Sequence, residues 1–483
     1  MKYFIGLDIG TSSVKAMLLN EREIVKIASR DYPVFYPKNG WSEQDPEDWY
    51  RETLSAMKEL LSGIDGKGVA SLSFSGQMHG LVMLDEEDRV IRPAILWNDG
   101  RSTKEVAYLN ETVGKGFLLD HTGNIAFAGF TAPKLLWVKA NEPEHFKRAR
   151  KILLPKDYVA YRLSGTFATD VSDAAGTLYF DTEHRCWSAP MLELLGITEE
   201  QLPKVYESNE IIGSLRPELA KELGLSDVKV VIGGGDNAAS AIGTGTLEDG
   251  ACNLSLGTSG TVFVVSDQYR CDRVNALHTF CSANGKYHYL ACILSAASCQ
   301  KWWMEEILKA NYDFENAEGY LGKSRVLFLP YLMGERSPIN DPDVRGAFFG
   351  LSMDTCRAEM SLAVLEGVAF ALRQNVDAIR SLGVAITSSK VCGGGTKTRL
   401  WLKILASVLN IRLQLPVMEH GGGLGAALLA AEAVLPPKEY SAMETRFYAV
   451  KETVQPDEAL VPLYEEKYQK YLQLYPAIRG LNL

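Results

Sequence analysis

The chain has 483 residues and a formal net charge of −10, and 46% of its residues are hydrophobic. A chain of this length is expected to form two or three domains. The acidic balance and the lack of a lysine- or arginine-rich cluster argue against a nucleic-acid partner. No stretch reaches the roughly 18 uncharged apolar residues of a membrane span, so we expect no membrane partner. The eight cysteines are scattered without close-set pairs, which predicts reduced thiols and a cytoplasmic protein.

The first predicted element is a hairpin whose turn recurs later in the chain. Apolar runs at 4–7 and 14–19 flank Gly10-Thr11-Ser12, and a second hairpin over 253–265 contains Gly257-Thr258-Ser259. Successive backbone N–H groups in such a turn form an anion-binding nest, although the same residues also make ordinary turns. The matched pair favours phosphate binding. Lys15, just beyond the first turn, is expected to add a weak phosphate contact; the alternative is a plain surface lysine.

Strands and helices alternate along the rest of the chain, which is typical of an α/β protein with largely buried sheets. The repeated turn divides the chain near residue 245, so we expect two similar α/β domains, 1–245 and 246–483. The predicted helices lie at 45–61, 102–110, 134–140, 156–163, 238–245, 296–309, 358–382, 401–409 and 421–433.

Two glycine-rich stretches imitate known nucleotide motifs. In "GGGTKT", Gly393–Thr398, a threonine separates the glycines from the lysine, so the stretch is no P-loop. "GGGLGA", Gly421–Ala426, follows a predicted strand as a dinucleotide fingerprint would, but it lies too close to the carboxyl end to begin a βαβαβ half. A dehydrogenase is therefore the less favoured interpretation.

Eight stretches, spread over residues 3 to about 435, carry a resemblance to a known family: "GLDIGTSSVK", "GQMHG", "AILWNDGRS", "GFTAPKLLW", "GGGDNAA", "LSLGTSG", "GAFFGLS…AVLEG" and "CGGG". Together they resemble the FGGY family of carbohydrate kinases. Within that family, the similarity is closest to members that act on D-xylulose. The resemblance implies two ribonuclease-H-like domains with the actin/hexokinase/Hsp70-type ATPase fold, with ATP and sugar meeting in an interdomain cleft.

Two aspartates are the candidate catalytic residues. Asp236 ends a glycine run at the carboxyl end of a strand, where α/β sheets bind ligands, but aspartate is also a favoured helix N-cap. The resemblance implies that Asp236 is the catalytic base. Asp8 interrupts an apolar strand, where a carboxylate is costly unless it is paired or near a metal. The resemblance implies that Asp8 holds Mg²⁺, usually through water; one metal needs one carboxylate, and the second hairpin carries Ser255 in its place.

The candidate sugar-binding residues follow strands in the first half. Met78 and His79 are bracketed by glycines, and the resemblance implies that both contact the sugar. Trp97 and Asp99 offer an aromatic face and a hydroxyl acceptor; the alternative is a packed tryptophan and an Asx turn. Asn237 is expected to bind a hydroxyl next to the one that reacts.

The adenosine is expected to rest against Gly394, Gly395 and Gly425, where missing side chains leave room for the base. With these residues, the resemblance implies ATP-dependent phosphorylation of D-xylulose with ATP and Mg²⁺. The alternatives are a kinase of another sugar or polyol, such as ribulose, gluconate, glycerol or a deoxy-ketose, and a non-enzymatic actin-like protein. The sequence leaves a homodimer open and gives no role to the loop Gly334–Asp341.

Overall fold

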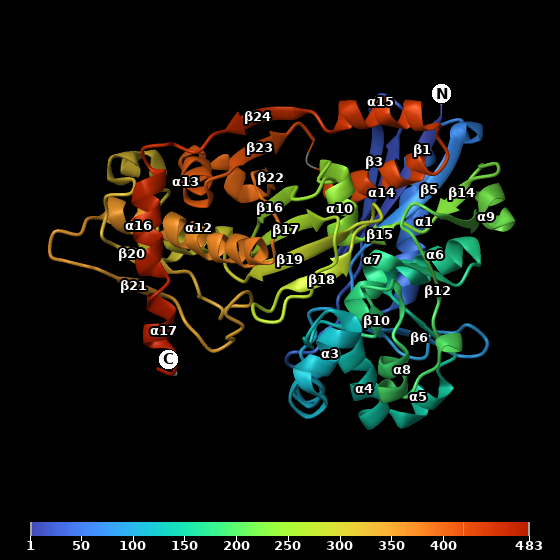
Figure 1. The fold of residues 1–483 in the computed structure, drawn as a ribbon. Helices are drawn as coiled ribbons and strands as arrows, with labels where there is room; N and C mark the ends of the chain where they lie inside the picture. The colour runs from blue at the N-terminus through green and yellow to red at the C-terminus, as the bar shows by residue number, and fades with distance from the viewer. Residues whose placement is uncertain (1, 419, 482–483) are drawn as a thin grey trace. The chain divides into compact units, whose positions relative to one another are not determined.

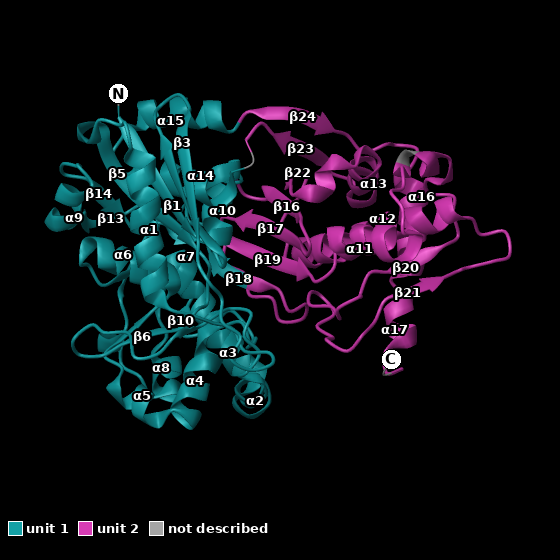
Figure 2. Ribbon diagram, turned by 180° about the vertical axis from the view of Figure 1, so that it is seen from behind, with its two compact units in different colours: residues 1–247, 279–287, 420–448 teal, residues 248–278, 288–419, 449–483 magenta. Residues whose placement is uncertain are grey.

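A computed structural model describes residues 2–418 and 420–481. The chain forms two compact units, which Figure 2 colours separately. Unit 1 contains Met1–Leu247, Thr279–Tyr287 and His420–Tyr448. Unit 2 contains Glu248–His278, His288–Glu419 and Ala449–Leu483.

The sheet of unit 1 is built around the first hairpin. Its strand order is β13 (Ile211–Ser214), β14 (Lys229–Val231), β5 (Val69–Gly76), β1 (Tyr3–Ile9), β2 (Ser13–Leu19) and β3 (Ile24–Asp31), with β15 (Gly234–Gly235) also paired to β5. β1 runs antiparallel to β2 and parallel to β5. The register places Asp8 between Lys15 on β2 and Ser75 on β5. The first predicted hairpin is therefore confirmed, and Asp8 lies near its turn.

Helices of unit 1 begin and end where local chemistry requires. α1 (Pro46–Leu61) starts at Asp45, whose side chain accepts a hydrogen bond from the N–H of Glu47 at 3.0 Å. α6 (Pro155–Ser164) ends at Gly165 in the left-handed conformation. α14 (Gly421–Glu432) packs against β1, β5 and α10 (Asp236–Thr244), and Figure 1 shows it beside α10.

The remaining elements of unit 1 surround this core. The short strands are β4 (Glu43–Gln44), β6 (Val82–Leu84), β7 (Ala94–Ile95), β8 (Lys151–Leu153), β9 (Ala168–Asp170), β10 (Phe180–Asp181), β11 (Cys186–Trp187) and β12 (Lys204–Tyr206). The helices are α2 (Thr103–Ala107), α3 (Lys115–Thr122), α4 (Thr131–Asn141), α5 (Pro143–Arg148), α7 (Val171–Ala174), α8 (Ala189–Leu195), α9 (Pro217–Glu222) and α15 (Pro437–Phe447). β18 (His278–Cys281) lies across the point where the chain passes between the units.

Unit 2 repeats the hairpin in a second sheet. Six of the seven strands of this sheet run in the order β19 (Tyr287–Ile293), β17 (Gly260–Ser266), β16 (Cys252–Leu256), β22 (Ser388–Cys392), β23 (Arg412–Pro416) and β24 (Val450–Val454), and β18 is the seventh. β16 and β17 are antiparallel, and β16 is parallel to β22, as in the first hairpin. The other elements are α11 (Ala297–Trp302), β20 (Leu327–Leu329), β21 (Ala347–Phe349), α12 (Arg357–Ser381), α13 (Arg399–Leu409), α16 (Val461–Tyr471) and α17 (Leu474–Ile478).

The observed units differ from the expected domains in one respect. The first division falls after Leu247, two residues from the expected one, but 279–287 and 420–448 return to unit 1. The reason is packing, because the buried residues of α14 cover the sheet of unit 1. Two helices expected to be regular, at 102–110 and 296–309, continue as π-helices over Tyr108–Gly114 and Trp303–Leu308.

Two further findings concern the helices and the cysteines. Across residues 2–418 and 420–481, every helix falls short of the combined length and apolarity that crossing a bilayer requires. All eight cysteines are free thiols.

Candidate active site

The first Gly-Thr-Ser turn keeps its carbonyl oxygens bonded to the protein. The carbonyl of Gly10 accepts from the hydroxyl of Tyr32 at 2.5 Å, and that of Thr11 accepts from the Gln44 side chain at 2.7 Å. The carbonyl of Ser12 accepts from the Tyr32 N–H at 3.1 Å. Within the described part of the chain, no acceptor bonds the N–H groups of Thr11 and Ser12. The turn thus presents donors, which suits an anion such as phosphate.

The second turn has the same arrangement in unit 2. The carbonyl of Gly257 accepts from the N–H of Ala297 at 2.9 Å, and that of Thr258 accepts from the hydroxyl of Ser298 at 2.7 Å. Thr258 and Ser259 are exposed. The carbonyl oxygens of Gly257 and Thr258, like those of the first turn, are thus bonded to the protein.

Asp8 lies at the end of β1 beside two groups that stabilise its charge. Burial raises its pKa, while a hydrogen bond from the Ser75 hydroxyl at 2.8 Å and the charge of Lys15 act in the opposite direction. Lys15 itself is exposed. At Gly422, the start of α14, an added Cβ would lie 2.4 Å from the Ser75 oxygen and 2.9 Å from an oxygen of Asp8. Glycine at this position leaves the oxygens of Asp8 and Ser75 uncovered by a side chain. Such oxygen atoms are the ligands that a partly hydrated Mg²⁺ prefers.

Asp236 is the first residue of α10, directly after β15. One carboxylate oxygen, Oδ1, accepts from the backbone N–H of Asn237 at 2.7 Å and from its side-chain amide at 2.8 Å. Burial and the nearby charge of Asp8 raise the pKa of Asp236 to about 7. The helix N-cap is Gly235, so the alternative role of Asp236 as N-cap is not the one observed. A carboxylate that titrates near neutrality is suited to accept a proton.

The side-chain amide of Asn237 donates to Asp236. Its expected contact with a sugar hydroxyl stays a prediction. Because the bond holds Oδ1, the other carboxylate oxygen of Asp236 is the one that Asn237 leaves for a substrate.

Met78 lies against the loop that leads to Asp236, and His79 lies against Gly176. His79 has a positive φ of 70°, and its Nδ1 lies 2.7 Å from the carbonyl of Gly176. A carbonyl can only accept, so Nδ1 donates, and in the neutral ring Nε2 is an acceptor for a hydroxyl. Met78 is 4% exposed, and a Cβ on Gly235 would come within 2.9 Å of its sulfur. The structure thus brings Met78 beside the Asp236 loop and His79 beside Gly176.

Two donors on α4 hold the backbone of His79. The Lys134 ammonium and the Thr131 hydroxyl donate to the His79 carbonyl at 3.0 and 3.1 Å. Burial lowers the pKa of Lys134 to about 7. Sequence reasoning missed this role; the available signal was a lysine in the otherwise apolar stretch "GFTAPKLLW".

Trp97 and Asp99 have separate surroundings. Trp97 is 42% exposed, and its indole N–H donates to the Thr11 hydroxyl at 2.9 Å, so it reaches the first turn. Asp99 is fully buried, and Arg101 donates to both of its oxygens at 2.8 and 2.7 Å. The N–H of Ser42 adds a third bond at 2.6 Å. Asp99 therefore anchors an ion pair here and is not an available hydroxyl acceptor.

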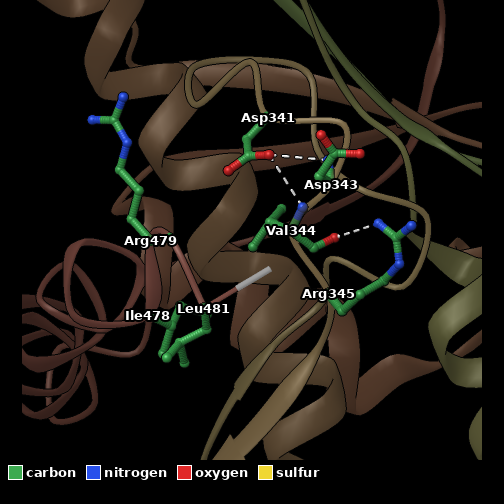
Figure 3. Close-up of a pocket in the computed structure, with 8 residues that line it drawn as sticks. Asp341, Asp343, Val344, Arg345, Ile478, Arg479 and Leu481 are labelled. Atoms are coloured by element: carbon green, nitrogen blue, oxygen red, sulfur yellow. Dashed lines mark hydrogen bonds between the residues drawn. The ribbon is translucent and has the colours of Figure 1, made fainter. Parts of the chain in front are cut away.

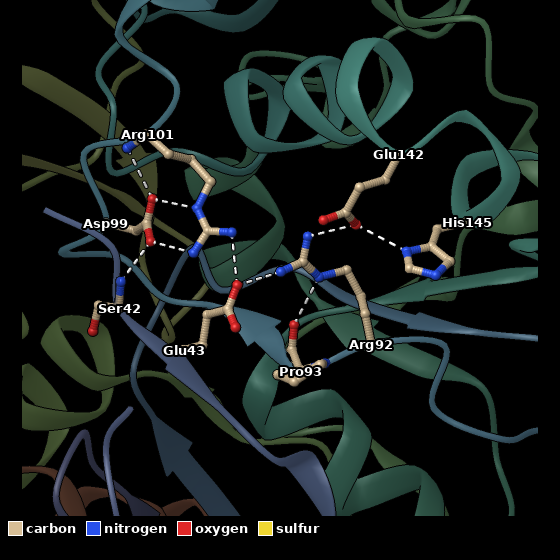
Figure 4. A network of polar contacts seen from close by, with 8 residues as sticks. All are labelled: Ser42, Glu43, Arg92, Pro93, Asp99, Arg101, Glu142 and His145. Carbon is tan, nitrogen blue, oxygen red and sulfur yellow. Dashed lines mark hydrogen bonds and ion pairs between the residues drawn. The ribbon is translucent and has the colours of Figure 1, made fainter. Parts of the chain in front are cut away.

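The ion pair of Asp99 and Arg101 is part of a larger network, shown in Figure 4. The Arg101 guanidinium also lies over the Trp41 ring, 3.8 Å from its centre. Glu43 joins Arg101 to Arg92. The network fixes the segment that carries Trp97, and its further members are Pro93, Glu142 and His145.

The three glycines expected beside adenosine fall in different places. Gly394, after β22 in unit 2, is exposed, and a Cβ added there would meet nothing within 4 Å. A Cβ on Gly395 would press against Leu256 at 2.9 Å. Gly425 lies in unit 1, where a Cβ would come within 1.7 Å of the Ala239 carbonyl. The close approach of α14 and α10 explains this glycine, so Gly425 is not carried further as an adenosine contact.

The loop Gly334–Asp341 joins parts of unit 2. Asp341 accepts from the Tyr475 hydroxyl at 2.9 Å and from the N–H groups of Asp343 and Val344 at 3.0 and 3.1 Å; the last two bonds are drawn in Figure 3. Glu335 is buried, which raises its pKa to about 7, and it accepts from two backbone N–H groups. The loop therefore anchors the last helix of the chain.

Comparison with known proteins identifies relatives over almost the whole chain. The model of the "FGGY family of carbohydrate kinases, N-terminal domain" matches residues 3–243, and that of the C-terminal domain matches residues 252–434. A xylulose kinase of Escherichia coli (strain K12) is 41% identical, with 99% of both chains covered. A solved structure described as a xyloylose kinase from Brucella ovis is 43% identical, with a TM-score of 0.93 over 99% of this chain and 100% of that one. A gluconate kinase from Lactobacillus acidophilus is 27% identical, with a TM-score of 0.92 over 99% and 98%.

Proposed function

The chain belongs to the FGGY family of carbohydrate kinases, and we propose that it transfers the γ-phosphoryl group of ATP to the C5 hydroxyl of D-xylulose. The observation that carries the proposal is the carboxyl of Asp236, with a pKa of about 7, in a loop that also contacts Met78. The relatives at 41% and 43% identity support the choice of sugar.

In the proposed reaction Asp236 removes the proton from the sugar hydroxyl as that oxygen attacks phosphorus. Asn237 holds Oδ1 and so orients the carboxylate. The Nε2 atom of His79 accepts a hydrogen bond from a second hydroxyl, because Nδ1 is committed to Gly176. Met78 contributes an apolar side chain that helps to exclude water from the reacting group.

The phosphates require donors and charge neutralisation. In the proposal the N–H groups of Thr11, Ser12, Thr258 and Ser259 bind phosphate oxygens, with weak help from Lys15. Asp8 would hold Mg²⁺, which neutralises the charge of the phosphates when it is bound. Gly394 leaves open space for the adenosine.

Gluconate is the second candidate acceptor, because the gluconate kinase of Lactobacillus acidophilus shares the fold at 27% identity. A sugar acid carries a carboxylate, which binds best to a cation. Two buried cations of unit 1 already have partners: Lys134 donates to backbone carbonyls, and Arg101 forms ion pairs with carboxylates. This arrangement favours a neutral ketose over a sugar acid.

The test is a panel of acceptors assayed for ADP release with Mg-ATP: D-xylulose, D-ribulose, gluconate and glycerol. We expect kcat/KM for D-xylulose to exceed that of each other acceptor by at least about tenfold, a discrimination that a few pocket contacts supply. Mass spectrometry and ³¹P NMR should identify the 5-phosphate. A gluconate value equal to or above that of xylulose would replace the first candidate with the second. ADP release that no acceptor stimulates would contradict both.

A further inference from the structure

A buried carboxylate lies beneath the glycine run that leads to Asp236. Asp170 ends β9, and its Oδ2 accepts from the hydroxyl of Ser172 at 2.5 Å and from the hydroxyl of Ser208 at 2.7 Å. Its other oxygen faces the ammonium of Lys156 at 3.1 Å. All four side chains are buried. Two serine hydroxyls therefore donate to the same oxygen of Asp170.

Both serines also bind the glycine run directly. The N–H of Gly235 donates to the Ser172 hydroxyl oxygen at 3.0 Å, and the N–H of Gly233 donates to the Ser208 backbone carbonyl at 3.0 Å. A hydroxyl has one hydrogen, and Ser172 gives it to Asp170, so its oxygen is left to accept. The result is a series of two hydrogen bonds with fixed directions: the Gly235 N–H donates to Ser172, and Ser172 donates to Asp170.

The negative charge of Asp170 is opposed by the ammonium of Lys156. Burial alone would lower the pKa of Lys156, but the carboxylates of Asp157, Asp170 and Asp173 raise it above its usual value. The ammonium lies 2.6 Å from Asp157 as well as near Asp170. A charged ammonium is the partner that a buried carboxylate needs to remain an acceptor.

The backbone of the glycine run fixes its direction, partly through β15, which pairs with β5. Gly233 has a φ of 72°, a conformation that side chains disfavour, and a Cβ added to Gly235 would come within 2.9 Å of Met78. Without side chains, the run is held by hydrogen bonds and by close contact. The position of Asp236, the next residue, depends on the peptide that Ser172 holds.

We propose that Asp170 and Ser172 are positioning residues for the catalytic base, because together they fix the Gly235 peptide and with it the direction of the Asp236 carboxylate. The inference rests on the proposed role of Asp236. Neither residue touches substrate in this account. Their effect is on the alignment of the base, which catalysis requires to within a fraction of an ångström.

The test compares Ser172→Ala with Ser208→Ala. Each removes one hydroxyl donated to Asp170 at a fully buried site, but only the first removes the acceptor of the Gly235 N–H, since Ser208 uses its backbone carbonyl. We expect Ser172→Ala to lower kcat by about 10- to 100-fold with the KM of ATP and sugar within about threefold. Ser208→Ala should keep kcat within about threefold. Equal losses of kcat in the two variants would overturn the proposal.

A double-mutant cycle asks whether Ser172 acts through the base. In an Asp236→Asn background, Ser172→Ala should cause little further loss of kcat, since the group that it positions is gone. A further loss as large as in the wild type would overturn the proposal. If Ser172→Ala does not fold, Ser172→Cys retains the volume with a weaker acceptor, and an undiminished kcat there would likewise overturn it.

Amide hydrogen exchange supplies a readout that needs no sugar. In the unliganded protein, the peptide containing 233–237 should exchange faster in Ser172→Ala than in the wild type or in Ser208→Ala. Unchanged exchange would overturn the inference. A wild type that phosphorylates no acceptor would refute the proposed function, while this exchange comparison would still decide whether Ser172 holds the loop.

Discussion

Asp8 and Asp236 are both aspartates at the ends of strands in unit 1, but their neighbours give them different chemistry. Asp8 has the Ser75 hydroxyl and Lys15 to oppose the effect of burial on its pKa. Asp236 has the negative charge of Asp8, which adds to the effect of burial. Carboxylates with such different surroundings can divide the work of holding a cation and accepting a proton.

The raised pKa of Asp236 has a consequence for stability in the unliganded protein. The folded pKa of about 7 exceeds the ordinary value of 3.8, so between these values the folded state binds more protons than the unfolded one. The free energy of unfolding then falls as pH rises through this window. Asp236→Asn lacks the effect, so its Tm relative to the wild type should rise by about 2–6 °C between pH 5 and pH 8.

Scanning calorimetry at the two pH values measures this difference. Asp227→Asn is the control, because Asp227 is an exposed partner of Lys229 with a lowered pKa. Its difference from the wild type should change little, since exposed ion pairs contribute little to stability. A Tm difference for Asp236→Asn that is the same at both pH values would contradict the raised pKa.

His79 should matter for sugar affinity and not for ATP. Its Nδ1 is bonded to Gly176, which leaves Nε2 as the acceptor in the neutral ring. His79→Ala should raise the KM of D-xylulose by about 10- to 100-fold, the loss expected for one hydrogen bond in a closed polar site. The KM of ATP should stay within about twofold. His184→Ala, at an exposed histidine paired with Asp181, is the control and should alter neither KM.

Initial-rate kinetics with each substrate varied in turn give the two KM values. A parallel rise in both would point to a structural histidine, whose loss disturbs unit 1 as a whole.

At the residue scale, the sequence was enough to propose candidate site residues but not to predict their hydrogen-bond partners. Asp236, Met78 and His79 could be proposed because glycines at strand ends mark ligand sites. The sequence could not show that hydrogen bonds occupy both carboxylate oxygens of Asp99, because one donor is Ser42, which is distant in the sequence. Ser172 and Lys134 were missed for the same reason: each acts on a backbone group that only the folded chain brings within reach.

At the scale of elements, α14 shows how one glycine-rich stretch serves two neighbours. Gly422 faces Asp8 and Ser75, whereas Gly425 faces α10. The motif resembled a nucleotide fingerprint because close approach to any backbone or ligand demands the same residue type. The spacing of its apolar residues and its length predicted a helix. The local sequence does not indicate which unit this helix packs against.

The packing account predicts opposite results for two alanine substitutions in α14. Gly425→Ala places a Cβ 1.7 Å from the Ala239 carbonyl and should lower the Tm by several degrees or prevent folding. At Gly423 the nearest atoms are 3.6 Å away or more, so Gly423→Ala should leave the Tm unchanged or raise it slightly through helix propensity.

Thermal unfolding of the purified variants, with soluble yield recorded for each, separates the two. A Gly425→Ala protein with a normal Tm and a raised KM for ATP would contradict the packing account and restore an adenosine contact.

At the scale of the whole molecule, unit 1 is completed by residues from the far end of the chain. The Ser71 hydroxyl on β5 donates to the Ala430 carbonyl on α14 at 2.6 Å in a buried contact. The repeated hairpins predicted two domains. The structure has two compact units, coloured in Figure 2, and each contains one of the hairpins beside a parallel strand. The return of 420–448 could not be predicted, because local patterns do not record which sheet a buried helix covers.

A fragment ending at residue 247 should therefore be unstable. Without α14, the apolar surface of β1, β5 and α10 is exposed to water, and the fragment should aggregate or unfold without a cooperative transition. Co-expression with residues 420–448 should increase its soluble yield. Circular dichroism and sedimentation of the two preparations test this. A monomeric 1–247 fragment that unfolds cooperatively by itself would contradict the assignment of α14 to unit 1.

The central claim is that Asp236 is the catalytic base, and the turnover of Asp236→Asn with D-xylulose and Mg-ATP tests it most directly. Asparagine keeps the shape and can still accept from Asn237, so both KM values should change little. General-base catalysis contributes about 10²–10⁴-fold, and kcat should fall by that factor. A variant that retains more than about a tenth of the wild-type kcat would contradict the account.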